Sequence, residues 1–336
     1  MDKRNYGIDI ARLLSMFFVV LLHNLGRGGV LDWTLSSPRS LAFATLENVA
    51  IVAVDVFALI SGYLSSGRKL RPWRLFDLWS SALFWSATLA IIGLIRGADL
   101  GIWTVRAFFP LLGNVYWYLS AYFVLQFLLP LIGAGAEGVG RKETSILTVL
   151  LIMACSIIGF TERRGIGDGY TAFWLMALWL AGRVIRENRS AIIQYISTRR
   201  LIVALILLPL CVTWFEWRDV AEGYDPSRWL SYMSPTAIIQ AICLFELLIR
   251  IKVRKMGIRK LLTALSESAL GVYLIDSSGW LYGFWLNDRF KWINQISTRY
   301  GIPLILGVSV LMFVVFLLAE CVRRYLATHL MRIARE

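Results

Sequence analysis

Residues 8–25 read IDIARLLSMFFVVLLHNL and indicate what kind of protein this is. The ionisable side chains in this segment are Asp9, Arg12 and His23, and its length falls within the range of about 17–25 residues that lets an α-helix cross a bilayer. The whole chain has the same character, because 58% of its 336 residues are hydrophobic and only 17% are charged, against about 25% charged in soluble domains. This composition excludes a disordered chain, a collagen-like chain and a disulfide-stapled secreted scaffold. The sequence therefore predicts an integral membrane protein.

Ten segments of the chain have the length and apolar character of transmembrane helices. They predict an all-α polytopic membrane protein, a bundle of about ten transmembrane helices that forms a single domain over residues 1–336. The shorter apolar segment Gly101–Leu112 is expected to be interfacial or re-entrant. The predicted spans are Ile8–Leu25, Leu41–Leu64, Leu75–Ile95, Val115–Ile132, Ser145–Phe160, Tyr170–Ile185, Leu201–Trp217, Leu230–Ile249, Leu261–Trp280 and Ile302–Val322.

The distribution of basic residues predicts how these spans are oriented. Ten spans place both chain ends on the same side of the membrane. If that side is the cytoplasm, the cytoplasmic segments hold about twice as many Lys and Arg as the outer loops, as the positive-inside rule requires. We therefore expect cytoplasmic N- and C-termini, and a first span that acts as a retained signal anchor. The net charge of +13 then needs no nucleic-acid partner.

Two familiar sequence patterns predict no ligand site. Gly133–Gly138 matches the G-x-G-x-x-G pattern of dinucleotide-binding loops, but it follows a membrane segment instead of a strand, so we expect a cytoplasmic turn. The four cysteines lie in apolar runs without a C-x-x-C pair, and no second histidine or cysteine pair lies near His23 to complete a zinc site. We therefore expect no metal and no permanently bound cofactor.

Arg12 and His23 are ionisable side chains at a depth in the predicted span where burying a charge costs free energy. An ionisable group inside the bilayer costs roughly 2.5–3.5 kcal/mol on insertion scales, so such groups are functional candidates. Eleven residues turn an α-helix by about 1100°, so both side chains project from one face, about 16 Å apart along the axis, with His23 toward the outer leaflet. A neutral imidazole can take a proton from a hydroxyl, and a guanidinium can hold a phosphate or polarise a carbonyl. The alternative for His23 is an interfacial histidine solvated at a helix end.

The second predicted span adds two acidic candidates. Glu47 lies near its outer end and Asp55 near its middle. Glu47 is expected at about the depth of His23, where it either orients the imidazole or pairs with a loop arginine.

A basic run, Arg68–Arg74, follows this span at the predicted cytoplasmic edge. It carries Arg68, Arg71 and Arg74 at intervals of three residues, a pattern that suits binding of an anion such as phosphate. Anchoring by the positive-inside rule is the simpler explanation on composition alone.

In combination these residues resemble the acyltransferase 3 family of mostly bacterial membrane O-acyltransferases. Arg12 through His23 match the family pattern R-x10-H, and Val54–Leu64 (VDVFALISGYL) is similar to its F-F-x-x-S-G-F/Y-L stretch. Asn114–Tyr122 (NVYWYLSAY) looks like the W-Y/F-L…Y segment of its fourth helix. Ser268–Asp276 (SALGVYLID) resembles the family's S-x-G-x-Y-L-x-H, but an aspartate stands where a histidine is usual.

The resemblance implies an enzyme of the bacterial inner (cytoplasmic) membrane that takes an acyl group, usually acetyl, from cytoplasmic acyl-CoA as donor substrate. The acceptor is a hydroxyl of a cell-envelope glycan or its lipid-linked saccharide precursor. We expect Asp276 to face the bundle interior, because an aspartate toward lipid is costly, and to contact the acceptor or another polar group. The expected catalytic residues are His23, Arg12 and Glu47; the expected donor-binding residues are Arg68, Arg71 and Arg74; the expected substrate-binding residues are Asp55, Tyr116, Trp117, Tyr122, Tyr273 and Asp276.

Two other function classes fit the same features. Ten helices with intramembrane charges also suit a secondary transporter, such as a flippase of a lipid-linked saccharide or a small-solute carrier, although no inverted repeat is detectable. A noncatalytic membrane component of a polysaccharide assembly complex is a third interpretation. Labelled acetyl-CoA distinguishes them, because only an enzyme moves the label to a product.

Overall fold

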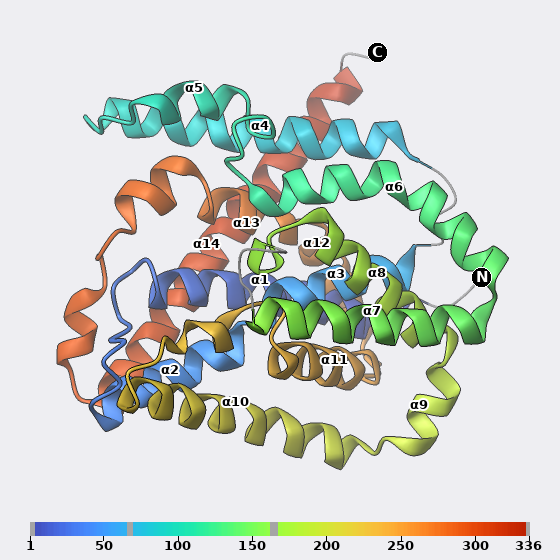
Figure 1. The fold of residues 1–336 in the computed structure, drawn as a ribbon. Helices are drawn as coiled ribbons and strands as arrows, with labels where there is room; N and C mark the ends of the chain where they lie inside the picture. The colour runs from blue at the N-terminus through green and yellow to red at the C-terminus, as the bar shows by residue number, and fades with distance from the viewer. Residues whose placement is uncertain (1–3, 66–69, 162–166, 334–336) are drawn as a thin grey trace.

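The computed structural model describes residues 4–65, 70–161 and 167–333, and the side chains up to residue 329 (Figure 1). Every regular element in these ranges is helical, which confirms the predicted all-α class. Figure 1 shows most of the long helices running broadly along one direction in stacked rows, with α4 (Pro72–Ile95) and α5 (Ile102–Phe108) at the top and α10 (Thr198–Ala221) at the bottom, while α14 (Thr298–Ile333) crosses them obliquely.

The N-terminal helix α1 (Tyr6–Leu25) lies in the middle of this bundle. It begins at Asn5, whose side chain accepts a hydrogen bond from the Gly7 amide at 2.9 Å. It packs against the helices of residues 38–64 and of residues 235–333, so the residues of its inward face meet side chains that are distant in sequence. These neighbours include α3 (Ala53–Leu64), α11 (Pro235–Ile249), α13 (Ala269–Asp276) and α14 (Thr298–Ile333).

The second predicted span is a helix with a break in it. Helix α2 (Pro38–Ala50) ends before α3 begins, and the intervening Ile51 and Val52 form a turn. The amide of Gln240 in α11 donates to the carbonyls of Asn48 at 2.9 Å and Val49 at 3.3 Å. An inserted side chain that takes over helix carbonyls is a known cause of a kink, and it explains this one without proline or glycine.

Helices α3 and α8 (Ala172–Glu187) pack backbone against backbone. A Cβ added at Gly62 would lie 1.9 Å from the Trp179 carbonyl oxygen, and one added at Gly182 would lie 2.1 Å from the Leu59 carbonyl oxygen. Only glycine permits such an approach, so the glycine of the Ser61-Gly62-Tyr63 segment has a packing role. The contact also buries Trp174 and Trp179 of α8 completely.

Eight helical segments among the described residues are long and apolar enough to cross a membrane. Two of the ten predicted spans are not among them. Helix α8 has 16 residues and therefore a length of about 24 Å, less than the bilayer core of about 30 Å. The predicted span Leu261–Trp280 is divided at Ser268 into α12 (Met256–Glu267) and α13. The count of ten therefore remains a prediction, as does the orientation of the termini.

Two loop predictions can be compared with the structure. The predicted turn at Gly133–Gly138 is wrong, because α6 (Trp117–Val139) continues through it and the chain reverses at Gly140, which has φ +96°. The apolar Gly101–Leu112 segment forms the short α5, which packs on α4 along one side of the bundle (Figure 1). The remaining elements are α7 (Arg141–Thr161), α9 (Arg189–Tyr195), η1 (Gly167–Gly169), η2 (Pro226–Leu230), η3 (Leu281–Trp285) and η4 (Lys291–Gln295).

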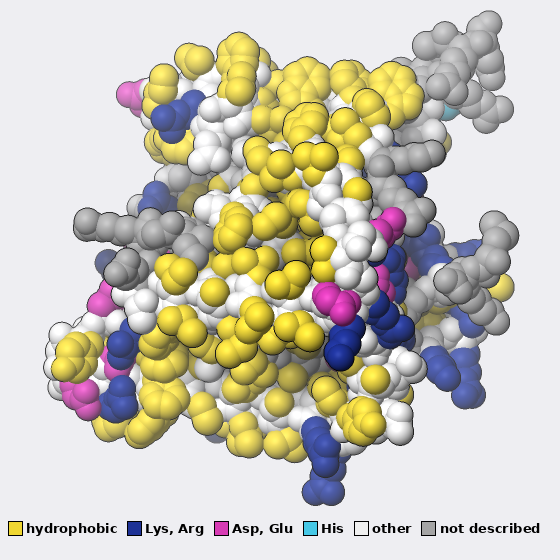
Figure 2. Space-filling view, turned by 45° about the vertical axis from the view of Figure 1, so that its right-hand side comes forward, with side chains coloured by type: hydrophobic (Ala, Val, Ile, Leu, Met, Phe, Trp, Pro, Cys, Tyr) yellow, Lys and Arg dark blue, Asp and Glu magenta, His cyan; other side chains and the backbone are white. Residues whose placement is uncertain are grey.

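The outer surface has the character of a membrane protein. Figure 2 shows hydrophobic side chains over most of the visible face, with Lys and Arg gathered mainly toward its right-hand side. Many large apolar side chains are exposed on the outer helices, for example Leu131 at 74% and Leu311 at 64%. Exposed apolar surface of this extent is rare on monomeric soluble proteins, and on helices long enough to cross a membrane it indicates contact with lipid.

Candidate active site

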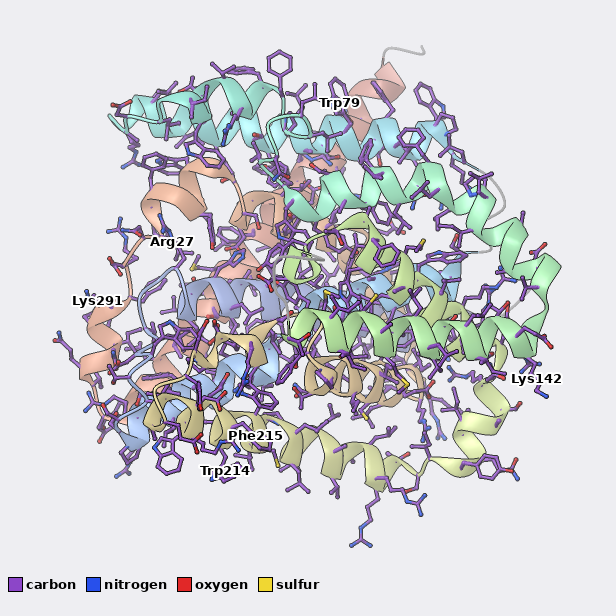
Figure 3. All side chains as sticks on the ribbon, in the orientation of Figure 1. Arg27, Trp79, Lys142, Trp214, Phe215 and Lys291 are labelled. Atoms are coloured by element: carbon purple, nitrogen blue, oxygen red, sulfur yellow. The ribbon has the colours of Figure 1, made fainter. Side chains whose placement is uncertain are left out.

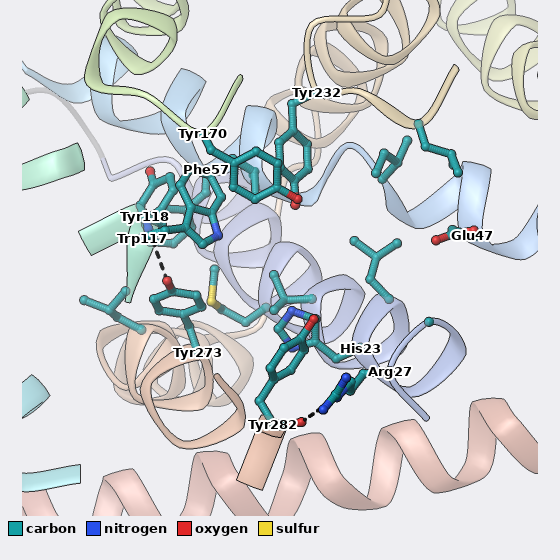
Figure 4. A pocket seen from close by; sticks show the side chains of 18 residues that line it. His23, Arg27, Glu47, Phe57, Trp117, Tyr118, Tyr170, Tyr232, Tyr273 and Tyr282 are labelled. Atoms are coloured by element: carbon teal, nitrogen blue, oxygen red, sulfur yellow. Dashed lines mark hydrogen bonds between the residues drawn. The ribbon is translucent and has the colours of Figure 1, made fainter. Parts of the chain in front are cut away.

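A cavity of about 260 Å³ lies along one face of α1 (Figure 4). The residues that α1 contributes recur every three or four positions, the spacing of a single helical face. The volume is close to the lower end of the range of about 300–1,000 Å³ for small-molecule sites. The α1 residues are Met16, Val19, Leu22 and His23; the others are Gly26, Arg27, Glu47, Ile51, Val54, Phe57, Trp117, Tyr118, Tyr170, Leu230, Tyr232, Leu270, Tyr273 and Tyr282.

His23 is held by a buried carboxylate. Its Nδ1 lies 2.5 Å from Oδ2 of Asp276, the last residue of α13, whose side chain is fully buried. The predicted interior position of Asp276 is thus confirmed, and its polar partner is His23. The imidazole remains 24% exposed and lines the cavity, and within the described residues Nε2 has no hydrogen-bond partner. Nε2 is therefore the nitrogen left for a substrate.

Tyr282 and Arg27 close the site around His23. The Tyr282 ring packs edge-on against the imidazole, with the ring centroids 4.6 Å apart. Arg27, one turn after His23, donates to the backbone carbonyls of Tyr282 at 3.2 Å and Gly283 at 2.8 Å, which ties η3 to the end of α1. Burial raises the pKa of the Tyr282 hydroxyl above its ordinary value, so this hydroxyl is neutral at physiological pH.

Aromatic side chains form the opposite wall of the cavity. The ring of Trp117 lies 4.4 Å from that of Tyr170 and 5.8 Å from that of Tyr232, measured between centroids. The start of α6 is fixed against α13 by two hydrogen bonds: Tyr116 donates to the Leu274 carbonyl at 2.9 Å, and the Tyr118 amide donates to the Tyr273 hydroxyl at 3.3 Å. The aromatic wall and the His23–Asp276 pair therefore rest on the same short helix.

Glu47 lines the same cavity at a distance from His23 (Figure 4). Its side chain is more than nine-tenths buried, and Oε2 has no hydrogen-bond partner in the part of the chain that the structure describes. Of the two predicted contacts, to His23 or to a loop arginine, neither occurs among the described residues. A buried carboxyl without a partner is costly, so its position in a cavity wall suits a ligand that supplies hydrogen bonds.

A second group of predicted residues gathers near the other end of α1. Arg12 lies one turn before Met16, on the face that lines the cavity, and its Nη1 is 3.8 Å from Asp9 Oδ1. Tyr122 interacts electrostatically with both Arg12 and Arg74, and its ring stacks on that of Tyr118 at 6.3 Å. The Tyr118–Tyr122 stack thus links this cationic group to the cavity wall.

The remaining predicted residues lie apart from the cavity. Arg71 and Arg74 are exposed at the start of α4, and Arg68 lies outside the described residues. Asp55 is fully buried and accepts a hydrogen bond from Trp174 Nε1 at 3.1 Å, so it stabilises the α3–α8 contact and does not line the cavity. Tyr116 is also fully buried behind the wall.

Several cavity residues were not found from the sequence. Tyr170, Tyr232 and Tyr282 belong to three separate segments and meet only in the fold. Each is an aromatic near the end of a predicted span, and that pattern is indistinguishable from the interfacial aromatic belt of any membrane protein. Arg27 is likewise an ordinary outer-loop arginine by sequence. Within the described residues, no group of three His, Cys, Asp or Glu side chains is arranged to hold a metal ion.

Comparison with known proteins identifies the family. The family model Acyl_transf_3, described as an acyltransferase domain, matches residues 5–324, which is nearly the whole chain and includes every cavity residue. No curated protein and no solved structure matches the chain. With its membrane-type helices and its cavity around His23, the chain therefore belongs to the acyltransferase 3 family of membrane acyltransferases.

Proposed function

We propose that this acyltransferase moves an acetyl group from cytoplasmic acetyl-CoA to a hydroxyl of a cell-envelope glycan or its lipid-linked precursor, in the bacterial inner membrane. The observation that carries the proposal is the His23 imidazole, which lines the cavity with Nδ1 bonded to Asp276 and with no hydrogen-bond partner for Nε2 among the described residues. An imidazole held in this way is suited to act as a general base.

The proposed reaction is a direct acyl transfer. The acceptor hydroxyl oxygen attacks the thioester carbonyl carbon, a C–O bond forms and the C–S bond breaks. His23 Nε2 takes the hydroxyl proton as the attack proceeds and returns it to the departing sulfur, so the products are an ester and free CoA thiol. No redox cofactor or metal is required for this balance.

The donor is proposed to enter from the Arg12 end of α1. Eleven residues separate Arg12 from His23, about 16 Å along the helix, which is on the scale of an extended pantetheine arm. Arg12 and Arg74 both act electrostatically on Tyr122, and guanidinium groups bind phosphate through charge-assisted hydrogen bonds. This arrangement suits phosphates of CoA held at the cytoplasmic end, with the thioester extending toward the cavity, in a bundle of about ten spans with cytoplasmic termini.

The acceptor is proposed to enter from the other end. Arg27 and Lys291 lie at one end of the bundle and Lys142 at the opposite end (Figure 3). Tyr282, which is 38% exposed, packs on His23 near Arg27, and Tyr170, which is 50% exposed, belongs to the opposite aromatic wall, so both walls have a ring that solvent reaches. Trp117, Tyr170 and Tyr232 present aromatic surface that suits the apolar face of a sugar ring.

The test uses purified protein in nanodiscs with radiolabelled acetyl-CoA and extracted envelope glycan. The wild type is expected to transfer label to the glycan as an ester, detected by mass spectrometry. His23→Ala should lower the rate about 10²–10⁴-fold, the usual cost of losing a general base. His329→Ala, at the exposed second histidine, is the matched control and should keep the wild-type rate.

Two results would contradict the proposal. Equal transfer rates for His23→Ala and wild type would show that His23 is not the general base. If no esterified product forms and the protein instead moves a labelled saccharide across proteoliposome membranes, then the protein is a secondary transporter and not an acyltransferase.

A further inference from the structure

Asp276 occupies a position that is unfavourable for a carboxylate in three respects. Its side chain is fully buried, it is the last residue of α13, and Oδ1 has no hydrogen-bond partner among the described residues. Burial of a charge is costly, and the carboxyl end of a helix disfavours negative charge. The contact that compensates for these costs is the 2.5 Å hydrogen bond from Oδ2 to His23 Nδ1.

We propose that Asp276 is a positioning residue that holds neutral His23 in the tautomer with its hydrogen on Nδ1. In this tautomer the lone pair is on Nε2, the nitrogen that faces the cavity. The inference rests on the proposed role of His23 as general base and adds how that base is prepared. The carboxylate also stabilises the imidazolium that forms when Nε2 takes the acceptor proton.

The surroundings of the imidazole support a fixed orientation. The Tyr282 ring packs edge-on against it at 4.6 Å, and Arg27 holds the Tyr282 and Gly283 carbonyls. On the Nδ1 side the contact is the Asp276 carboxylate, which is carried by a helix packed directly on α1. The ring is therefore confined on two sides, and Asp276 decides which nitrogen carries the proton.

An asparagine at position 276 reverses this preference. If its oxygen faced Nδ1, its NH₂ group would take the place of Oδ1, a buried atom that has no hydrogen-bond partner among the described residues. Buried unpaired N–H groups are rarer than under-satisfied carbonyls, so the NH₂ group should face Nδ1 instead. It then donates to the Nδ1 lone pair, and the histidine proton moves to Nε2, where it blocks the base.

Nuclear magnetic resonance measures the tautomer directly. The chain contains only His23 and His329, so ¹⁵N-histidine labelling in a His329→Gln background leaves a single imidazole. We expect wild-type His23 to show a protonated Nδ1 and an unprotonated Nε2 at the pH of the transfer assay, and Asp276→Asn to show the opposite tautomer. Ser277→Ala is the matched control, because it removes a buried hydroxyl that has no described partner one residue away.

Kinetics supply the second measurement. Asp276→Asn should lower kcat about 10²–10⁴-fold, with KM for acetyl-CoA within twofold of wild type; the equivalent change in a Ser-His-Asp triad lowers kcat about 10⁴-fold. Ser277→Ala should keep both constants.

Three outcomes would overturn the inference. Wild-type His23 could carry its proton on Nε2 or be an imidazolium under assay conditions, and this result needs no variant to fold. Asp276→Asn could keep the wild-type tautomer. It could also raise KM for the acceptor at unchanged kcat, which would make Asp276 an acceptor-binding residue. A different result would separate this inference from the proposed reaction. If wild-type protein shows the Nδ1–H tautomer but transfers no acetyl group, the proposed reaction is refuted, whereas the role of Asp276 in positioning His23 still holds.

Discussion

Replacing Gly62 by alanine tests whether the Ser61-Gly62-Tyr63 segment is needed for packing or for chemistry. The new Cβ would lie 1.9 Å from the Trp179 carbonyl oxygen, whereas real Cβ contacts stay above 3.0 Å, so α3 and α8 must separate by about 1.1 Å. A backbone carbonyl in a helix cannot rotate away, so the strain should reach the upper part of the range of about 1–3 kcal/mol for overpacking.

A control separates this strain from helix propensity. Alanine in a helix interior is favoured over glycine by about 1 kcal/mol at any position. Gly135 in α6 is exposed, and a Cβ there would meet no atom within 4 Å, so Gly135→Ala should have only that gain. The net result is a loss of about 2 kcal/mol for Gly62→Ala and a gain of up to about 1 kcal/mol for Gly135→Ala.

Thermal unfolding in detergent, followed by tryptophan fluorescence, measures the difference. The apparent midpoint should fall for Gly62→Ala and stay level or rise for Gly135→Ala. Folded Gly62→Ala protein should also have reduced transfer activity, because α3 carries Phe57 and α8 follows Tyr170, both in the cavity wall. Equal midpoints for the two variants would refute the packing argument, and a selective loss of activity at equal stability would give the segment a chemical role.

Two further predictions concern the ligands of the site. Glu47→Gln keeps the shape of the side chain but removes its carboxylate. If Glu47 binds an acceptor hydroxyl, kcat/KM for the acceptor should fall about fivefold, since a hydrogen bond to a charged group is worth about 1 kcal/mol more than a neutral one. A changed KM for acetyl-CoA instead would place Glu47 on the donor. Arg71→Ala and Arg74→Ala should each raise KM for acetyl-CoA several-fold through loss of a phosphate contact, whereas Lys142→Ala, at the same end of the bundle, should not. If all three variants keep the wild-type KM for acetyl-CoA, the basic run Arg68–Arg74 does not bind the donor and serves only to orient the chain in the membrane.

Local sequence properties determined the class of this protein and part of its site. Apolar runs of sufficient length identify membrane helices, because a span must satisfy its backbone internally and bury its own length in lipid. The R-x10-H spacing places Arg12 and His23 on one face of α1 through helix geometry alone, and the cavity follows that face. The membrane span over residues 8–25 and the shared helix face of Arg12 and His23 could be predicted without knowing where any other helix lies.

Packing between helices decided the rest. Asp276 is separated from His23 by 253 residues, and their hydrogen bond depends on how α13 sits against α1. The break between α2 and α3 depends on Gln240 of α11, and the full burial of Trp174 and Trp179 in α8 depends on glycines that let two backbones touch. Hydropathy describes each helix alone, so it predicted the depth of Glu47 but not its neighbours. Which side chains meet across a bundle is fixed by the register and spacing of packed helices, and close contacts such as Gly62 with Trp179 set both.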